Sequence, residues 1–97
     1  PLLGQAAAAK TRLAEVRQKA HALGSAGAQR ALARIEDDRL VEALDAALNR
    51  ARTGSAPGGE CESCLSELQR AISEVEKTLR IAEENKAFLD GIRSLYG

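Results

Sequence analysis

The stretch from Glu60 to Gly97 constrains the fold more than any other part of the sequence. It contains no proline, and Gly91 is its only internal glycine. Since these are the two residues that most disfavour a helix interior, we expect one helix over about residues 60–96. At about 1.5 Å per residue this helix spans roughly 50 Å, longer than any helix the rest of the chain can lay beside it. Part of it must therefore extend past its neighbours.

A first, shorter helix is predicted over about residues 5–23. Apolar residues recur there at spacings of three and four, which is the signature of one apolar face of a helix. They are Ala6, Ala9, Leu13, Val16, Ala20 and Leu23. The segment Gly24-Ser25-Ala26-Gly27 follows, and its glycines favour a helix end and a tight reversal of the chain.

A second helix is predicted over about residues 28–52. Its broad apolar face is formed by Leu32, Ile35, Leu40, Val41, Leu44, Leu48 and Ala51. The register slips near Asp37-Asp38-Arg39, which we interpret as a weak spot or a solvent-facing turn and not as a helix end. Residues 53–59 are rich in glycine, serine and proline, a composition that predicts a flexible loop.

Short connections between three helices favour an up-down-up arrangement. The sequence therefore predicts an all-α fold: an antiparallel three-helix bundle in one domain over residues 1–97, with a long, protruding, coiled-coil-like third helix. The chain begins with Pro1 and not with methionine. We interpret it as a piece cut from a larger intracellular protein.

The charges balance overall but are distributed unevenly. Fourteen Lys and Arg residues stand against fourteen Asp and Glu residues. A nucleic-acid or anionic-membrane surface normally needs a basic excess, so we expect no nucleic-acid partner. The first predicted helix has four basic residues and one acidic residue, whereas the third has five basic and eight acidic. In the up-down-up arrangement these two helices run side by side. Their opposite charges could attract each other, or each charged face could simply be solvated by water, and both interpretations stay open.

The third predicted helix has two apolar faces at different heights. In its lower half, one face is formed by Cys61, Leu65, Leu68, Ile72, Val75, Leu79 and Ala82. At about 100° per residue, Lys86 and Arg93 continue that face. The apolar residues of the upper half lie on a face turned by roughly 120°. They are Ile81, Phe88, Leu89, Ile92, Leu95 and Tyr96.

This upper face is the candidate partner-binding site. It holds the only Phe and the only Tyr of the chain, and aromatic anchors are typical of protein interfaces. We expect it to bind another helix, from a different protein or from a second copy. The alternative is that it covers the next element of the parent protein, or folds onto the turn around Leu23 to Ala28.

Cys61-Glu62-Ser63-Cys64 is the one motif that could carry chemistry. A two-residue spacing supplies half of a tetrahedral zinc site, but His21 is the only histidine and lies near the other end of the predicted bundle. A site shared between chains, completion by Glu60 or Glu62, and a redox role through a lowered thiol pKa stay open. The simpler interpretation is that both are half-buried cysteines with a structural role only, so we predict no metal.

The sequence thus predicts a protein-interaction or oligomerisation module of scaffold or adaptor type. We find no phosphate-binding loop and no grouping of acid, base and nucleophile, so we expect neither an enzyme nor a cofactor or small-molecule substrate. His21 is expected to be a solvated residue at a helix end. A lipid-surface-binding bundle is an alternative, although the polar faces are not consistently basic. Two cysteines without a disulfide framework favour a cytoplasmic, reducing setting.

Overall fold

The computed structural model describes residues 2–54 and 59–96, which form four helices. These are α1 (Leu2–Leu23), α2 (Ala26–Asp37), α3 (Leu40–Arg52) and α4 (Glu60–Tyr96). Helix α1 begins a few residues earlier than predicted, whereas α4 has the predicted bounds. Within the described ranges there is no strand. The predicted loop over residues 53–59 lies partly outside the described residues; Thr53, Gly54 and Gly59 are not helical.

The turn between α1 and α2 has the predicted glycine-dependent geometry. Gly24 adopts a positive φ of 63°, which a residue without a side chain accepts readily. Ser25 then caps α2, because the Ala28 N–H donates a 3.2 Å hydrogen bond to its Oγ. The chain therefore reverses within two residues, Gly24 and Ser25, and α2 returns alongside α1.

The second predicted helix is in fact two helices, so the prediction of no helix end near Asp37-Asp38-Arg39 was wrong. Helix α2 ends at Asp37, and Arg39 has a left-handed conformation at φ 53° and ψ 43° before α3 begins. The reason lies in the apolar spacing: Ile35 and Leu40 are five residues apart, about 140° from each other on one continuous helix. One left-handed residue resets the register, and both segments then turn their apolar side to α4.

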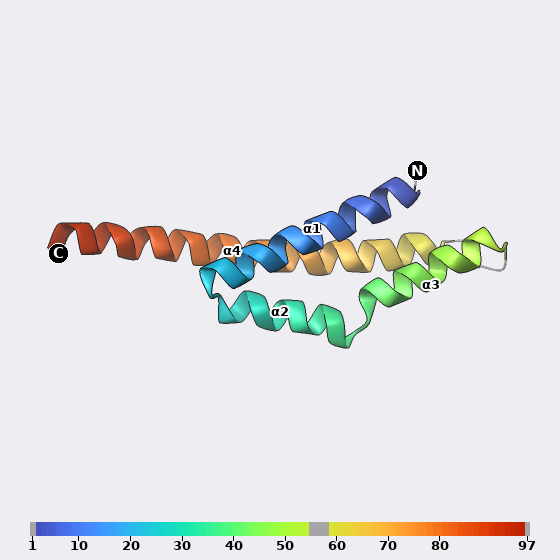
Figure 1. The fold of residues 1–97 in the computed structure, drawn as a ribbon, viewed down its shortest axis with the longest axis horizontal. Coiled ribbons are helices and arrows are strands. Elements are labelled where there is room, and N and C mark those ends of the chain that lie inside the picture. Colours follow the sequence, from blue (N-terminus) through green and yellow to red (C-terminus); the bar gives the residue numbers. More distant parts are fainter. Residues whose placement is uncertain (1, 55–58, 97) are drawn as a thin grey trace.

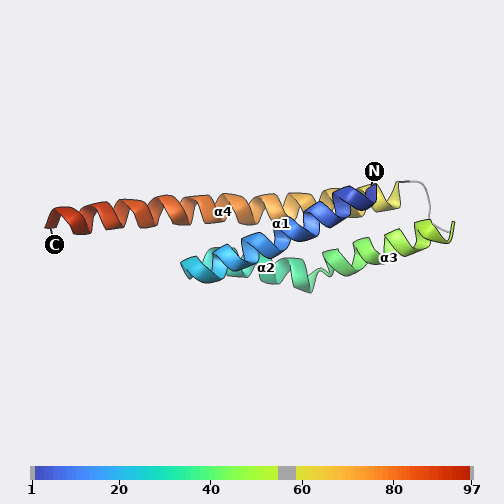
Figure 2. The same cartoon turned by 45° about the horizontal axis from the view of Figure 1, so that its top comes forward.

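Joined across this bend, α2 and α3 act as one arm of a three-helix bundle (Figures 1 and 2). Helices α1 and α4 run in the same direction, and the α2–α3 arm runs against them, as the up-down-up prediction requires. The core consists of apolar side chains from all four helices. They are Ala6, Ala9, Leu13, Val16, Ala20, Ala28, Leu32, Ile35, Leu44, Ala47, Cys61, Leu65, Leu68, Ile72, Val75 and Leu79.

The long C-terminal helix gives the molecule an elongated shape of 64 × 25 × 16 Å. Helix α4 continues well beyond the turn that joins α1 to α2 (Figure 1). Leu79 is its last buried residue, and every residue from Glu83 to Tyr96 is exposed. Among the described residues, no helix is both long and apolar enough to cross a bilayer.

Candidate protein-interaction surface

The six predicted partner-binding residues all lie on the part of α4 that extends past the bundle. Their exposed fractions run from 36% for Ile92 to 87% for Tyr96. At about 100° per residue they occupy an arc of roughly 120° on one side of the helix. We call this set the apolar face, and it consists of Ile81, Phe88, Leu89, Ile92, Leu95 and Tyr96.

Nothing in residues 2–54 and 59–96 covers the apolar face. Helices α1 and α2 meet lower on α4, where a Cβ atom built on Gly27 would lie 3.2 Å from Thr78 Cγ2. The turn around Leu23 to Ala28 therefore lies beside Thr78 and does not fold over the apolar face. The exposed fractions of Phe88 and Leu95, 68% and 80%, fit this placement.

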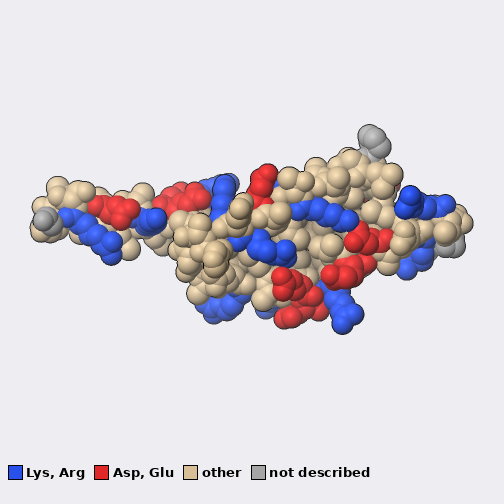
Figure 3. All heavy atoms as spheres, viewed as in Figure 1, with Lys and Arg blue, Asp and Glu red and all other residues tan. Residues whose placement is uncertain are grey.

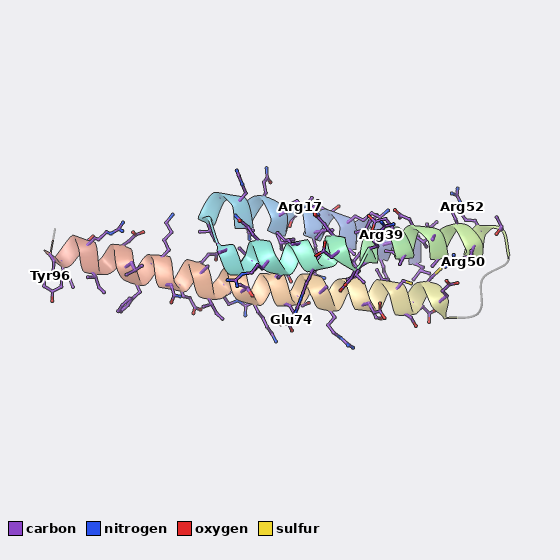
Figure 4. All side chains as sticks on the ribbon, turned by 90° about the horizontal axis from the view of Figure 1, so that it is seen from below. Arg17, Arg39, Arg50, Arg52, Glu74 and Tyr96 are labelled. Atoms are coloured by element: carbon purple, nitrogen blue, oxygen red, sulfur yellow. The ribbon has the colours of Figure 1, made fainter. Side chains whose placement is uncertain are left out.

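A groove runs between α2 and α4 directly below the apolar face. We call it the α2–α4 groove; it has a volume of about 930 Å³. Its lining is Gly27, Arg30, Ala31, Ala33, Arg34, Ile35, Asp37, Asp38, Leu40, Glu67, Arg70, Ala71, Glu74 and Thr78. Half of these residues are charged, which differs from the mostly apolar lining of a small-molecule site. Figure 4 shows α2 beside α4, with Glu74 on this stretch and Tyr96 at the far end.

The groove and the apolar face lie on the same side of α4. Seven residues turn a helix by about 700°, only 20° short of two full turns, so residues seven apart share a side. Two such series run from groove residues into the upper half of α4. They are Glu67, Glu74, Ile81, Phe88 and Leu95, and Ala71, Thr78, Asn85 and Ile92. We call these two series the strip, which spans roughly 40 Å along the helix.

The two cysteines lie at the opposite end of α4. Cys61 is buried in the core, Cys64 is half-buried, and both are free thiols. Burial raises the pKa of Cys64, and the negative charges of Glu60 and Glu67 raise it further, whereas Arg50 acts in the opposite direction. A reactive thiolate needs the opposite shift, so the local electrostatics disfavour the redox alternative. No group of three or more metal-binding side chains comes together within the described part of the chain.

His21 lies in the last turn of α1 and is exposed. This is the helix-end position expected from the sequence. It is at the end of α1 that meets α2, whereas Cys61 and Cys64 are in the first turns of α4, at the other end of the bundle (Figure 1).

Among the residues that the structure describes, one ion pair links the basic first helix to the acidic last one: Arg12 Nη2 lies 2.5 Å from Glu76 Oε1. The other interhelical pairs of α1 go to the middle arm, from Lys10 to Asp45 and from Arg17 to Glu36. These side chains are about 40 to 65% exposed, so each pair adds little stability, at most about 1 kcal/mol. On the face shown in Figure 3, basic and acidic side chains alternate along the molecule.

Comparisons of the chain with protein-family models, with curated proteins and with solved structures found no match. Function is therefore inferred from the geometry of the chain itself. Sequence reasoning identified the residues of the apolar face but missed the α2–α4 groove. The seven-residue steps from Thr78 to Ile92 can be read from the sequence and place these residues on one side of α4. The sequence does not show that α2 packs beside that side.

Proposed function

We propose that this chain is a protein-interaction module that binds a helix through the apolar face of α4. The helix belongs either to another protein or to a second copy of the chain, and the role is that of a scaffold or adaptor, without catalysis. We place it in a reducing, intracellular setting, as its two free cysteines favour.

The observation that carries the proposal is the exposure of six large apolar side chains on one side of α4. Leu3 is the only other large apolar residue that is exposed among the described residues. Monomeric soluble proteins rarely leave large contiguous apolar patches in water, and such patches commonly mark interfaces. Phe88 and Tyr96 supply aromatic anchors, the residue types in which interface hot spots are enriched.

The test compares two variants that place the same two negative charges on opposite sides of α4. Phe88→Asp with Ile92→Asp alters the apolar face, whereas Ala87→Asp with Ser94→Asp alters the opposite side of the same segment. Molar mass in solution over a range of concentrations reports self-association, and pull-down with the immobilised chain reports other partners. We expect association in the native chain and in the Ala87 and Ser94 variant, and its loss in the Phe88 and Ile92 variant.

Two results would contradict the proposal. One is a native chain that stays monomeric and retains no protein partner. The other is equal association by both double variants, because binding would then not depend on the apolar face. Helical content from circular dichroism checks that each variant keeps its fold, which is expected because all four positions are exposed.

A further inference from the structure

The α2–α4 groove and the apolar face together define a longer docking site than the apolar face alone. The strip carries both of them on one side of α4, and the groove supplies a concave wall beside its lower half. A concave channel continued by an apolar helix face fits a helix lying lengthwise. A flat lipid surface would meet Phe88 and Leu95 but would not enter the groove.

Basic residues border the strip on the side where α2 packs. Lys86 and Arg93 follow Ile72 and Leu79 at seven-residue steps, so they continue the buried side of α4 above the bundle. Below them, Arg30 and Arg34 of α2 line the groove. Within the described residues, none of these four side chains takes part in an ion pair.

The other border is also more basic than acidic. Arg70, Lys77 and Glu84 follow one another there at seven-residue steps. Lys77 Nζ lies 3.8 Å from Glu74 Oε1, so Glu74 partly neutralises the charge of Lys77 within α4. The acidic residues of the groove lie mainly at its lower end, where Asp37 and Asp38 close α2 and Glu67 lies on α4.

From these positions we infer that the strip binds an amphipathic helix of another protein whose apolar side is flanked by acidic residues. The inference rests on the proposed function and specifies the partner. The apolar side of that helix meets Ile81, Phe88 and Ile92, and its acidic flanks meet Lys86, Arg93 and the arginines of α2. In an antiparallel pair of copies docked through the strip, Lys86 and Arg93 of one copy would lie against the same residues of the other, and this repulsion disfavours that mode of self-association.

Two designed 21-residue peptides serve as probes, each roughly 32 Å long as a helix. Both have leucine at the heptad a and d positions; one has glutamate and the other lysine at the flanking e and g positions. Like charges on the flanks keep each peptide from pairing with itself. Fluorescence anisotropy then gives the dissociation constants at low and at high salt.

We expect the glutamate peptide to bind at least tenfold more tightly than the lysine peptide at low salt, with a smaller ratio at high salt. Arg30→Glu with Arg34→Glu should remove most of that preference. Lys19→Glu with Arg52→Glu changes the net charge equally at exposed positions away from the strip, and should preserve it. Phe88→Asp should weaken binding of both peptides.

Equal binding of the two peptides, tighter binding of the lysine peptide, or an equal effect of both charge variants would overturn the inference and leave the proposed function intact. Failure of both peptides alongside a native dimer that Phe88→Asp dissociates would overturn it in favour of a second copy. Failure of both peptides with co-sedimentation of the chain on phosphatidylserine vesicles would overturn both the inference and the proposed function.

Discussion

Gly27 packs directly against Thr78, so that a Cβ atom at Gly27 would lie only 3.2 Å from Thr78 Cγ2. This contact joins the start of α2 to α4 at the upper end of the bundle. It also marks the point where the α2–α4 groove passes into the apolar face, because Thr78 lines the groove and Ile81 follows one turn later. The absence of a side chain at Gly27 thus sets how closely α2 approaches the strip.

Gly27→Ala should change stability differently in two backgrounds. Alanine is favoured over glycine in a helix by about 1 kcal/mol, but here its methyl group meets Thr78 Cγ2. Thr78→Ser removes that methyl and keeps the hydroxyl that donates to the Glu74 carbonyl oxygen at 3.0 Å. We expect Gly27→Ala to be nearly neutral in the native chain and stabilising by about 0.5–1 kcal/mol in the Thr78→Ser background. Both effects are measured by urea denaturation. Equal effects in the two backgrounds would show that contact with Thr78 Cγ2 does not offset the stabilisation expected from alanine.

Ile72 and Ile81 provide a matched pair for separating the scaffold from the binding surface. Ile72 is fully buried, and Ile81 is 59% exposed nine residues later on the same helix. Ile72→Ala should lower the free energy of unfolding by about 2–5 kcal/mol because it leaves a cavity in the core. Ile81→Ala should change it by less than about 0.5 kcal/mol. Comparable losses, measured by thermal denaturation of the two variants, would mean that the upper half of α4 contributes to the core.

The folded chain should be more stable with glycine than with arginine at position 39. It is the only non-glycine residue with a positive φ among the described residues, and this conformation costs an L-residue roughly 1 kcal/mol. Arg39→Gly should therefore raise the melting temperature, in contrast to the usual effect of glycine in a helix. Ala14→Gly, at an exposed position inside α1, is the control and should lower it. A lower melting temperature for Arg39→Gly would indicate that the arginine side chain has a stabilising contact worth more than the strain.

Periodicity predicted the helices well because buried positions of one helix must recur at fixed intervals. The residues from Cys61 to Leu79 that were assigned to the lower face are buried, and those of the apolar face are exposed. The same reasoning signals an irregularity near Arg39 but does not identify it as a helix end. The five-residue step from Ile35 to Leu40 cannot lie on one helix face, but a bend inside one helix and a left-handed break between two helices give the same pattern.

The α2–α4 groove could not be predicted because it depends on packing across elements. Periodicity says which side of α4 is buried but does not say which part of that side α2 occupies and which part α1 occupies. For the same reason, the sequence alone does not show that Arg30 and Arg34 lie beside α4. Only the placement of Gly27 against Thr78 brings them beside the strip that continues into the apolar face.

The thiol of Cys64 should titrate at higher pH in the folded chain than in the unfolded chain. Its pKa is raised first by burial and then by Glu60 and Glu67. Folding therefore favours the protonated thiol. The resulting stability is fully present below the pKa of the unfolded thiol, about 8.5, and is lost as the pH rises through the folded value.

The Cys61→Ala variant leaves Cys64 as a single thiol for this measurement. We expect the rate of its alkylation by iodoacetamide to rise with pH around a higher midpoint in buffer than in concentrated urea. Glu67→Gln should lower the midpoint of the folded chain, whereas Glu83→Gln, far along α4, should not move it. A folded midpoint at or below the unfolded one would restore the redox interpretation of the cysteine pair, because a reactive cysteine requires a stabilised thiolate.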